Sequence, residues 1–327
     1  MTRLALRQMR WSIVATAVLL VGVVVWLVLL RNGLTDTLYR IGLPQCQAAG
    51  GDCGEQLRDF ADQYRWTVNT FGALEFLPVL VGLFWGAPLI AREVEQGTHR
   101  LVWTQSISPR RWLAVKLGLF GLAAIAVAAV QVGAVVWWNQ PFTGLGLEDT
   151  SPMNGLYHYR GIVPFGTMLY GLAAGVVCGA LIRRTVPAMA VAIPAYLGPR
   201  VAVALSREHL PPAPHVLRYP FPDGNPRSGL GDRQVDYQIV DGSGNPIPGS
   251  SLTDICPPDE PLEELGRGTA KGRPDLECIA AHGIRSEVHY YPVESFWPLQ
   301  AIEFGLFAGL AGLVLALAVW WTLRRIA

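Results

Sequence analysis

Four uncharged apolar stretches dominate the 327-residue sequence: Trp11–Leu30, Leu117–Trp138, Gly161–Ile182 and Phe304–Leu323. Each is long enough to cross a bilayer core, which takes about 20 predominantly apolar residues in a helix. The composition agrees, because only 16% of the residues are charged and the mean hydropathy is +0.31, whereas soluble domains carry about 25% charged residues. The sequence therefore predicts an integral membrane protein.

Two weaker stretches fit between the strong ones. Gly72–Ala91 contains one carboxylate and two prolines, and Thr185–Leu205 contains three prolines and an arginine. Proline is tolerated in membrane helices where neighbouring groups satisfy the freed backbone atoms. We therefore predict an all-α polytopic bundle of six spans, at about 11–30, 72–91, 113–138, 161–182, 185–205 and 300–323. Together, 1–205 and 298–327 form the transmembrane domain.

The distribution of basic residues predicts the orientation. Twelve of the 26 Lys and Arg residues fall in segments 1–10, 92–116, 183–184 and 324–327: Arg3, Arg7, Arg10, Arg92, Arg100, Arg110, Arg111, Lys116, Arg183, Arg184, Arg324 and Arg325. These segments hold only two acidic residues, Glu93 and Glu95, so their net charge is +10, and the rest of the chain carries 14 basic and 23 acidic residues. The positive-inside rule then places both termini in the cytoplasm. No small-residue cleavage site follows the first span, so we expect it to be retained.

Two polar segments fall on the predicted outer face. Residues 31–71 form an outer loop with Cys46 and Cys53, and residues 206–297 form an extracytoplasmic domain with Cys256 and Cys278. Disulfides persist in oxidising compartments, and four cysteines allow three pairings. We favour Cys46–Cys53 and Cys256–Cys278, which close the shortest loops, over free thiols. Neither pair has the spacing of a zinc site, so we expect no metal.

The large outer domain is predicted to contain β-structure. Val235–Val240 alternates polar and apolar residues before a turn at Asp241–Asn245, and Glu287–Val293 is a second extended stretch. The start of the turn resembles a calcium loop, but its twelfth position is Leu252, so a hairpin turn is favoured. No nucleophile elbow is present, and no catalytic residue is predicted.

The segment after the second span has a compact pattern of helix signals. Gly97 suits a left-handed helix end, Thr98–Gln105 suits a short helix, and Ser108 followed by Pro109 suits the start of the third span. We expect residues 92–112 to form a charged helical elbow in the cytoplasm. An ordinary positively charged loop is the alternative.

The elbow sequence resembles that of a known family. Residues 92–98, an Arg-Glu-x-Glu-x-Gly-Thr run, and residues 101–117 are similar to the ABC-2-type permeases of ATP-binding cassette transporters, closest to a branch common in high-GC Gram-positive bacteria. Residues 6–10, 160–165, 179–190 and 296–303 match in the same order along the chain. The resemblance extends across the chain, and it implies a protein of the plasma membrane of a bacterium.

The resemblance implies a transport subunit, not an enzyme, that is driven by a separate ABC ATPase. In the family the elbow is a coupling helix seated in a groove of the ATPase, which here implicates Arg92, Glu93, Glu95, Gly97, Thr98, Arg100 and Trp103. The chain lacks a phosphate-binding G-x-x-x-x-G-K-[ST] loop, so Mg-ATP would bind to the partner and this chain would hold no cofactor. The family also implies a second permease copy or homologue as a partner, together with membrane lipids. Basic blocks with interleaved aromatics are missing, so no nucleic acid is expected.

Three charged residues lie within or beside predicted spans at similar depth: Glu75, Arg200 and Glu303. Arg200 lies about 22 Å from the inner face by helix rise. Charges in the membrane are costly unless paired or hydrated, so two interpretations stay open. Arg200 either forms an ion pair that closes an outer gate or extends to the lipid headgroups.

Glycines repeat every four residues in three predicted spans: Gly82/Gly86, Gly171/Gly175/Gly179 and Gly305/Gly309. Small residues at this spacing allow helices to pack closely. We favour packing within one subunit, and a seam between two copies stays possible.

The leading hypothesis is an export permease that moves an amphipathic or lipid-like molecule by alternating access. The alternative is a receptor or scaffold whose outer domain binds a ligand, with no transport and no ATPase partner.

Overall fold

The computed structural model describes residues 2–50, 53–97, 108–143, 145, 150–206, 213–223, 225–226, 231–257 and 275–325. The chain divides into two units. The helical unit comprises Met1–Leu145, Gly155–Pro211 and Trp297–Ala327, and the sheet unit comprises Gly146–Asn154 and Pro212–Phe296. The elbow positions Thr98, Arg100 and Trp103, and the short helix expected around them, lie outside the described residues.

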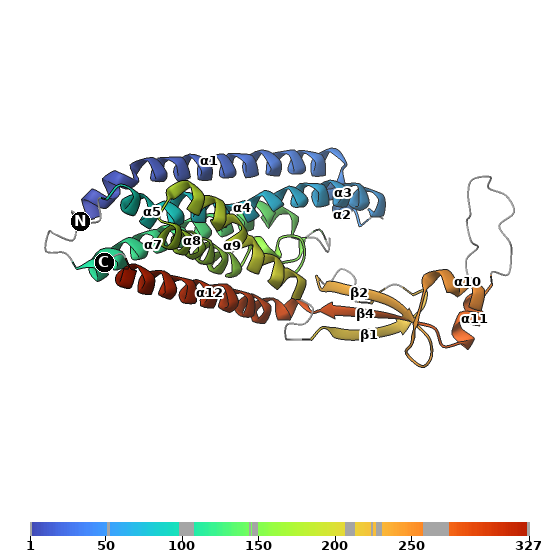
Figure 1. The fold of residues 1–327 in the computed structure, drawn as a ribbon. Helices are drawn as coiled ribbons and strands as arrows, with labels where there is room; N and C mark the ends of the chain where they lie inside the picture. Colours follow the sequence, from blue (N-terminus) through green and yellow to red (C-terminus); the bar gives the residue numbers. More distant parts are fainter. Residues whose placement is uncertain are drawn as a thin grey trace. The chain divides into compact units, whose positions relative to one another are not determined.

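The helical unit is built from long helices that run alternately in opposite directions (Figure 1). Its main elements are α1 (Thr2–Arg40), α2 (Leu43–Ala48), α3 (Gly54–Thr70), η1 (Phe71–Glu75), α4 (Phe76–Val81), the π-helical turn η2 (Gly82–Gly86), α5 (Ala87–Glu95), α7 (Pro109–Asn139), η5 (Tyr157–Tyr159), α8 (Val163–Ile182), α9 (Thr185–Ser206) and α12 (Phe296–Arg325). Helix α1 begins, α5 ends, and α12 ends at the same end of this unit, which we call the terminal end; the opposite end is the loop end. Helix α1 begins at Thr2, so residues 2–10 and the first predicted span form one helix.

Six helical stretches among the described residues are long and apolar enough to cross a membrane: Ala17–Arg40, Gly54–Glu95, Pro109–Phe142, Val163–Ile182, Thr185–Ser206 and Val293–Arg324. The predicted six-span helical fold is confirmed. The second stretch is much longer than the predicted 72–91, because α3, η1, α4, η2 and α5 follow one another without a break.

Much of the segment expected as an outer loop is helical. Helix α1 continues to Arg40, and α2 and α3 follow. Helix α3 is polar overall, but Phe60 and Tyr64 are fully buried on one face, where they meet Phe142. The predicted disulfide Cys46–Cys53 is confirmed and joins α2 to the residue before α3.

Helix α8 is the centre of the bundle. Within the apolar part of each span, 72% of the residues are buried in α8, compared with 11% in α1 and 17% in α9. The exposed apolar faces of α1 and α9 suit contact with lipid. Gly171, Gly175 and Gly179 bring its backbone against the stretch from Pro78 to Ala87. A Cβ atom at Gly175 would lie 2.8 Å from the carbonyl carbon of Gly82 and would overlap its oxygen. This glycine row therefore packs within the subunit, as favoured from the sequence.

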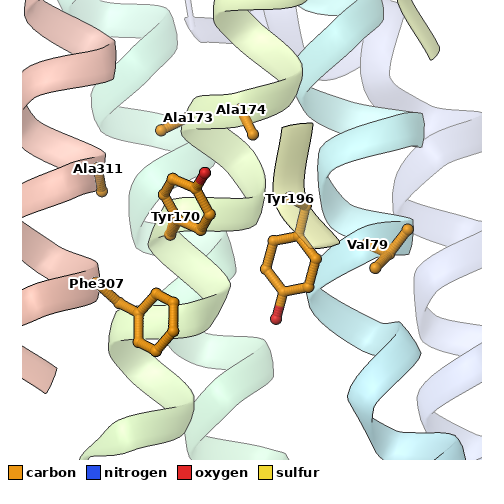
Figure 2. Close-up of a cluster of buried hydrophobic side chains, with 7 residues drawn as sticks. All are labelled: Val79, Tyr170, Ala173, Ala174, Tyr196, Phe307 and Ala311. Atoms are coloured by element: carbon orange, nitrogen blue, oxygen red, sulfur yellow. The ribbon is translucent and has the colours of Figure 1, made fainter. Parts of the chain in front are cut away.

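A small aromatic core lies beside this contact (Figure 2). Tyr170 of α8 stacks on Tyr196 of α9, with 5.7 Å between ring centroids, and meets Phe307 of α12 at 5.8 Å. The Tyr170 hydroxyl donates a hydrogen bond to the carbonyl of Ala195 at 2.7 Å. These contacts fix the relative positions of α8, α9 and α12 close to Arg200.

The sheet unit contains a four-stranded antiparallel sheet in the order β1-β4-β2-β3. Its strands are β1 (His215–Pro220), β2 (Arg233–Val240), β3 (Pro246–Ile247) and β4 (Arg285–Tyr291). Strands β2 and β4 confirm the two extended stretches predicted from the sequence. The Asp241 carboxylate accepts hydrogen bonds from the backbone N–H groups of Ser243 and Asn245, both at 2.8 Å, which confirms a hairpin turn between β2 and β3.

A small core of Leu252, Cys256, Ile279 and Ile284 lies beside the sheet. It belongs to α10 (Leu252–Ile255), α11 (Leu276–Ala281) and their flanking residues. The disulfide Cys256–Cys278 ties these helices together and confirms the second predicted pairing. His282 Nδ1 lies 3.4 Å from the Cys278 sulfur, but both sulfurs are committed to the disulfide.

Candidate functional site

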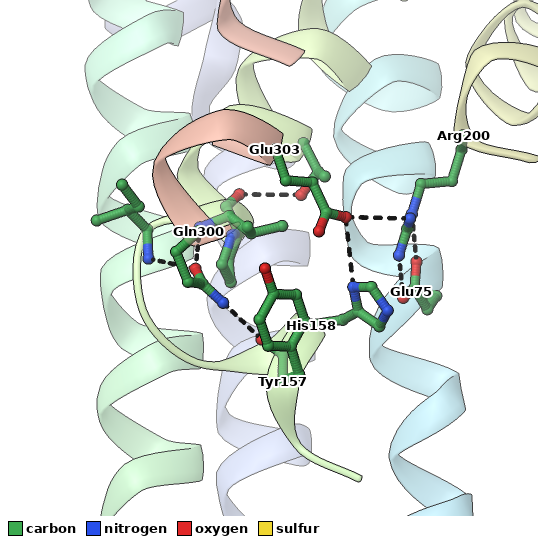
Figure 3. A network of polar contacts seen from close by, with 10 residues as sticks. Glu75, Tyr157, His158, Arg200, Gln300 and Glu303 are labelled. Carbon is green, nitrogen blue, oxygen red and sulfur yellow. Dashed lines mark hydrogen bonds and ion pairs between the residues drawn. The ribbon is translucent and has the colours of Figure 1, made fainter. Parts of the chain in front are cut away.

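The three charged residues singled out within the spans meet in one cluster at the loop end (Figure 3). Arg200 comes from α9, Glu75 from the end of η1 and Glu303 from α12. The Arg200 guanidinium binds Glu75 in a two-pronged arrangement, with Nη2 2.9 Å from Oε1 and Nε 3.2 Å from Oε2. Its Nη1 lies 3.4 Å from Glu303 Oε1. Arg200 is therefore paired rather than extended toward headgroups.

The cluster is largely screened from solvent. The exposed fractions of the side chains are 11% for Arg200, 8% for Glu303 and 34% for Glu75. Two-pronged pairing of guanidinium and carboxylate is the strongest geometry available to such groups. A buried charge of this kind is retained only where its partners stay in place. The cluster thus ties η1, α9 and α12 together at the loop end.

Two residues that the sequence did not single out complete the cluster. His158 of η5 places Nδ1 3.4 Å from Glu303 Oε1. One turn before Glu303, Gln300 accepts hydrogen bonds from the N–H groups of Ile162 and Val163 and donates one to the Tyr157 carbonyl, at 3.0, 2.9 and 2.9 Å. These contacts hold the start of α8 and the preceding turn against α12. No spacing in the sequence links residue 158 to the three charges. The i, i+3 spacing of Gln300 and Glu303 on one helix is the signal that could have identified Gln300.

A second polar arrangement lies at the terminal end, at the base of the predicted elbow. Glu93 of α5 forms an ion pair with Lys116 of α7, and the two side chains are 15% and 14% exposed. The Lys116 ammonium also lies 4.5 Å from the centre of the Trp112 ring, a cation–π arrangement. Glu95 Oε2 accepts two hydrogen bonds from Thr185, from its N–H at 3.1 Å and its hydroxyl at 2.8 Å.

The described elbow residues otherwise follow the predicted local geometry. Gly97 has a φ of 69°, the left-handed conformation expected at the end of the second span. Ser108 accepts a hydrogen bond from the Arg111 N–H at 3.3 Å, and Pro109 occupies the first turn of α7. Arg92 is exposed. The role of these residues in coupling stays a prediction.

The sheet unit has a polar cluster of its own around Glu287 of β4, whose side chain is 6% exposed. His289 on the same strand, Arg218 on β1 and Gln238 on β2 contact the carboxylate at 3.0, 2.5 and 2.6 Å. Hydrogen bonds from His289, Arg218 and Gln238 lower the pKa of Glu287 to about 2. The contacts from Arg218 and Gln238 join β4 to its two neighbouring strands, which indicates a structural role.

Acid should loosen the sheet unit. The pKa of Glu287 is lower in the folded chain than its ordinary value of 4.5, so its contribution is complete above pH 4.5 and is lost as the pH falls toward 2. We expect the local stability of β2 and β4 to fall by roughly 2 kcal/mol over this range. Hydrogen exchange of peptides from these strands, corrected for intrinsic rates, measures the change in the full chain. Glu287→Gln should flatten the pH profile, and an unchanged profile would contradict the assignment.

The fold and the site together define a multi-pass helical membrane protein with a paired charge cluster in its bundle and a small antiparallel sheet between its last two spans. The model of the family described as ABC-2 membrane transporter related matches residues 17–207, more than half of the chain. The chain belongs to this family. A search of curated proteins found no match, and a search of solved structures found none either.

Family membership has direct consequences. The chain is a membrane subunit of a transporter rather than an enzyme, and an ABC ATPase is the general partner of such subunits. The match includes the first five spans and the elbow, but neither α12 nor the strands of the sheet unit.

Proposed function

We propose that this chain is the membrane-spanning permease of an ATP-driven exporter for an amphipathic or lipid-like molecule. A separate ABC ATPase binds Mg-ATP and hydrolyses it, and the elbow at residues 92–112 docks on that ATPase. The family match over residues 17–207 carries the proposal. It favours a transporter over a receptor or scaffold, which would need no ATPase.

The proposed orientation places the terminal end of the bundle in the cytoplasm of a bacterial cell. Basic residues flank the helix ends there, namely Arg92, Arg110, Arg111, Lys116, Arg183, Arg184 and Arg324. Such an excess is typical of cytoplasmic loops. The ATPase would then meet the elbow on the side where ATP is available. The two disulfides would lie on the oxidising side.

In this proposal the Arg200 cluster closes the outer end of the transport path. Arg200 joins elements from three parts of the chain, so separating α9 from η1 or α12 requires breaking a screened charge contact. Alternating access needs an outer closure of this kind, which opens only after the cytoplasmic ends of the helices have moved. The cluster supports a gate because its partners lie on different helices.

An apolar groove supports the substrate class. It has a volume of about 450 Å³ and lies between α1 and the η1–α4 segment, where Val18, Gly22 and Trp26 of α1 face Leu74 of η1 and Leu77 of α4. Aliphatic and aromatic side chains line it, so it suits an alkyl chain far better than a charged solute. The groove lies on membrane-spanning helices, where lipid-like molecules are at high concentration.

A second copy or a homologue is proposed to complete the transporter. On α12, added Cβ atoms at Gly305, Gly309 and Gly312 would meet nothing within 4 Å, unlike those on α8. Small residues on an open membrane helix permit close approach by another helix. Membrane lipids would cover the remaining apolar faces, and no nucleic-acid partner is proposed.

Reconstitution tests the function. The chain would be captured with its ATPase and placed in phosphatidylcholine–phosphatidylglycerol vesicles that contain a fluorescent phospholipid. We expect MgATP to accelerate movement of the fluorescent lipid between leaflets, and a partner ATPase with its catalytic glutamate replaced should abolish the acceleration. Equal movement with and without MgATP would contradict the proposed substrate class, and the loss of any ATPase from the captured sample would contradict the transporter.

A further inference from the structure

The two carboxylates of the elbow motif face the chain's own helices. We propose that Glu93 and Glu95 are positioning residues that transmit movement of the elbow to α7 and α9, rather than residues that contact the ATPase. Lys116 and Thr185 are their partners in this role. The inference rests on the proposed function, because it assigns roles within the coupling of an ATPase to this permease.

Glu93 is directed into the bundle. Its Oε1 contacts the Lys116 ammonium, and its Oε2 is also buried. A carboxylate with one oxygen fully buried is stable only while its cation is held close. Lys116 is held in turn by the Trp112 ring on the same helix. The two helices on either side of the elbow, α5 and α7, are therefore fastened together at its base.

Glu95 is fastened to the beginning of α9. Thr185 is the first residue of that helix, and the first N–H groups of any helix lack acceptors within it. The Glu95 carboxylate supplies an acceptor to the Thr185 N–H and a second one to its hydroxyl. A negative charge at this position is also favoured by the helix dipole. Glu95 thus acts as an N-terminal cap that α5 provides for α9.

Helix α9 has a second attachment to the same helical stretch. Glu75 and Glu95 both belong to the uninterrupted stretch Gly54–Glu95, and Glu75 holds Arg200 near the far end of α9. The alanine-rich core between α5, α8 and α9 fills the interval near the terminal end, with Ala87, Ala91, Ala188 and Ala192. A displacement of the elbow therefore moves the first turn of α9. Because α9 continues to Arg200, the same displacement also acts on the Arg200 cluster.

Binding of the ATPase and transmission of its movement can be distinguished by experiment. If the carboxylates dock, removing either one weakens ATPase binding, and changing Lys116 or Thr185 has no effect on it. If they transmit, ATPase binding survives in all four kinds of variant. The response of α9 to nucleotide is then lost when Glu95 or Thr185 is changed, and the response of α7 is lost when Glu93 or Lys116 is changed. The readouts are the affinity for the ATPase and the nucleotide-dependent hydrogen exchange of α7 and α9.

The experiment uses the full chain in nanodiscs with its captured ATPase. The variants are Glu95→Ala, Thr185→Val and Lys116→Met, and Glu95→Gln is the conservative variant because its amide oxygen still accepts a hydrogen bond. For the wild type we expect MgATP with vanadate to change the exchange of the peptide covering residues 183–193. Glu95→Ala should reduce that change about five-fold or more, whereas its ATPase affinity stays within about two-fold of wild type. Glu95→Gln should retain most of the response.

Two results would overturn the inference. One is a ten-fold or larger loss of ATPase affinity in Glu95→Ala with a normal exchange response in the complex that still forms. The other is a normal affinity with a normal α9 response in Glu95→Ala and Thr185→Val and a normal α7 response in Lys116→Met. Either leaves the proposed function standing. If the wild-type chain captures no ATPase at all, the proposed function fails and the inference fails with it.

Discussion

Gly175→Ala is expected to lower the free energy of unfolding of the helical unit by about 3 kcal/mol or more. The new Cβ would lie 2.8 Å from the Gly82 carbonyl carbon and 2.9 Å from the Ala87 nitrogen. Both atoms belong to backbone, so no side chain can rotate away. Because Gly171 and Gly179 make similar contacts on the same face, α8 cannot shift at one point without losing its fit elsewhere. The change should be measured by titration with SDS in mixed micelles.

Gly309→Ala is the matched control. It makes the same chemical change in another membrane helix, at an exposed position where an added Cβ meets nothing within 4 Å. We expect its free energy of unfolding to lie within about 0.5 kcal/mol of the wild-type value. Equal destabilisation by the two variants would show that the loss of a glycine, rather than the backbone contact at Gly82, sets the cost.

Arg200→Gln is expected to destabilise the helical unit by about 3–5 kcal/mol, the usual cost of removing one partner from a buried ion pair. Glu303 would keep a carboxylate that is 8% exposed and would lose its guanidinium partner. Glu75 is one-third exposed and can be rehydrated. We therefore attribute most of the cost to Glu303. Thermal unfolding in detergent should show a clearly lower midpoint.

A second substitution tests that assignment. Arg200→Gln combined with Glu303→Gln removes the stranded charge, so the double variant should be more stable than Arg200→Gln alone. Arg110→Gln, at an exposed position of α7, should leave the midpoint almost unchanged. A stable Arg200→Gln variant would mean that the cluster contributes nothing to holding α9 and α12 together.

The membrane spans were predictable because length and apolar composition alone define them. The glycine row of α8 was predictable for the same reason, since its spacing is a local property of one helix. Which helix it packs against was not, because that depends on contacts between segments about 90 residues apart. The helical character of residues 54–70 was also hidden, since α3 is polar overall and only residues such as Phe60 and Tyr64 face the interior.

In the candidate site, too, local features could be predicted from the sequence and contacts between distant segments could not. Depth in the membrane brought Glu75, Arg200 and Glu303 together as candidates, because helix rise converts sequence position into height. His158 escaped notice because the short turn η5 places it. Gln300 lies on α12, but its partners come from η5 and from the start of α8, and a pattern along α12 does not reveal them. For Glu93 and Glu95 the motif was visible but their partners were not. Lys116 and Thr185 are 23 and 90 residues away from them, and a pattern along one segment carries no information about such contacts.

The most direct test of the central claim is the mass of the complex that this chain forms. An affinity-tagged copy would be expressed in the cells that encode it, extracted in mild detergent and measured by native mass spectrometry. We expect species that contain the 35.6 kDa chain together with an ATPase subunit that has a phosphate-binding loop. Masses that correspond only to the chain or its multiples, under conditions where other transporters keep their ATPases, would contradict the assignment to an ATP-driven permease.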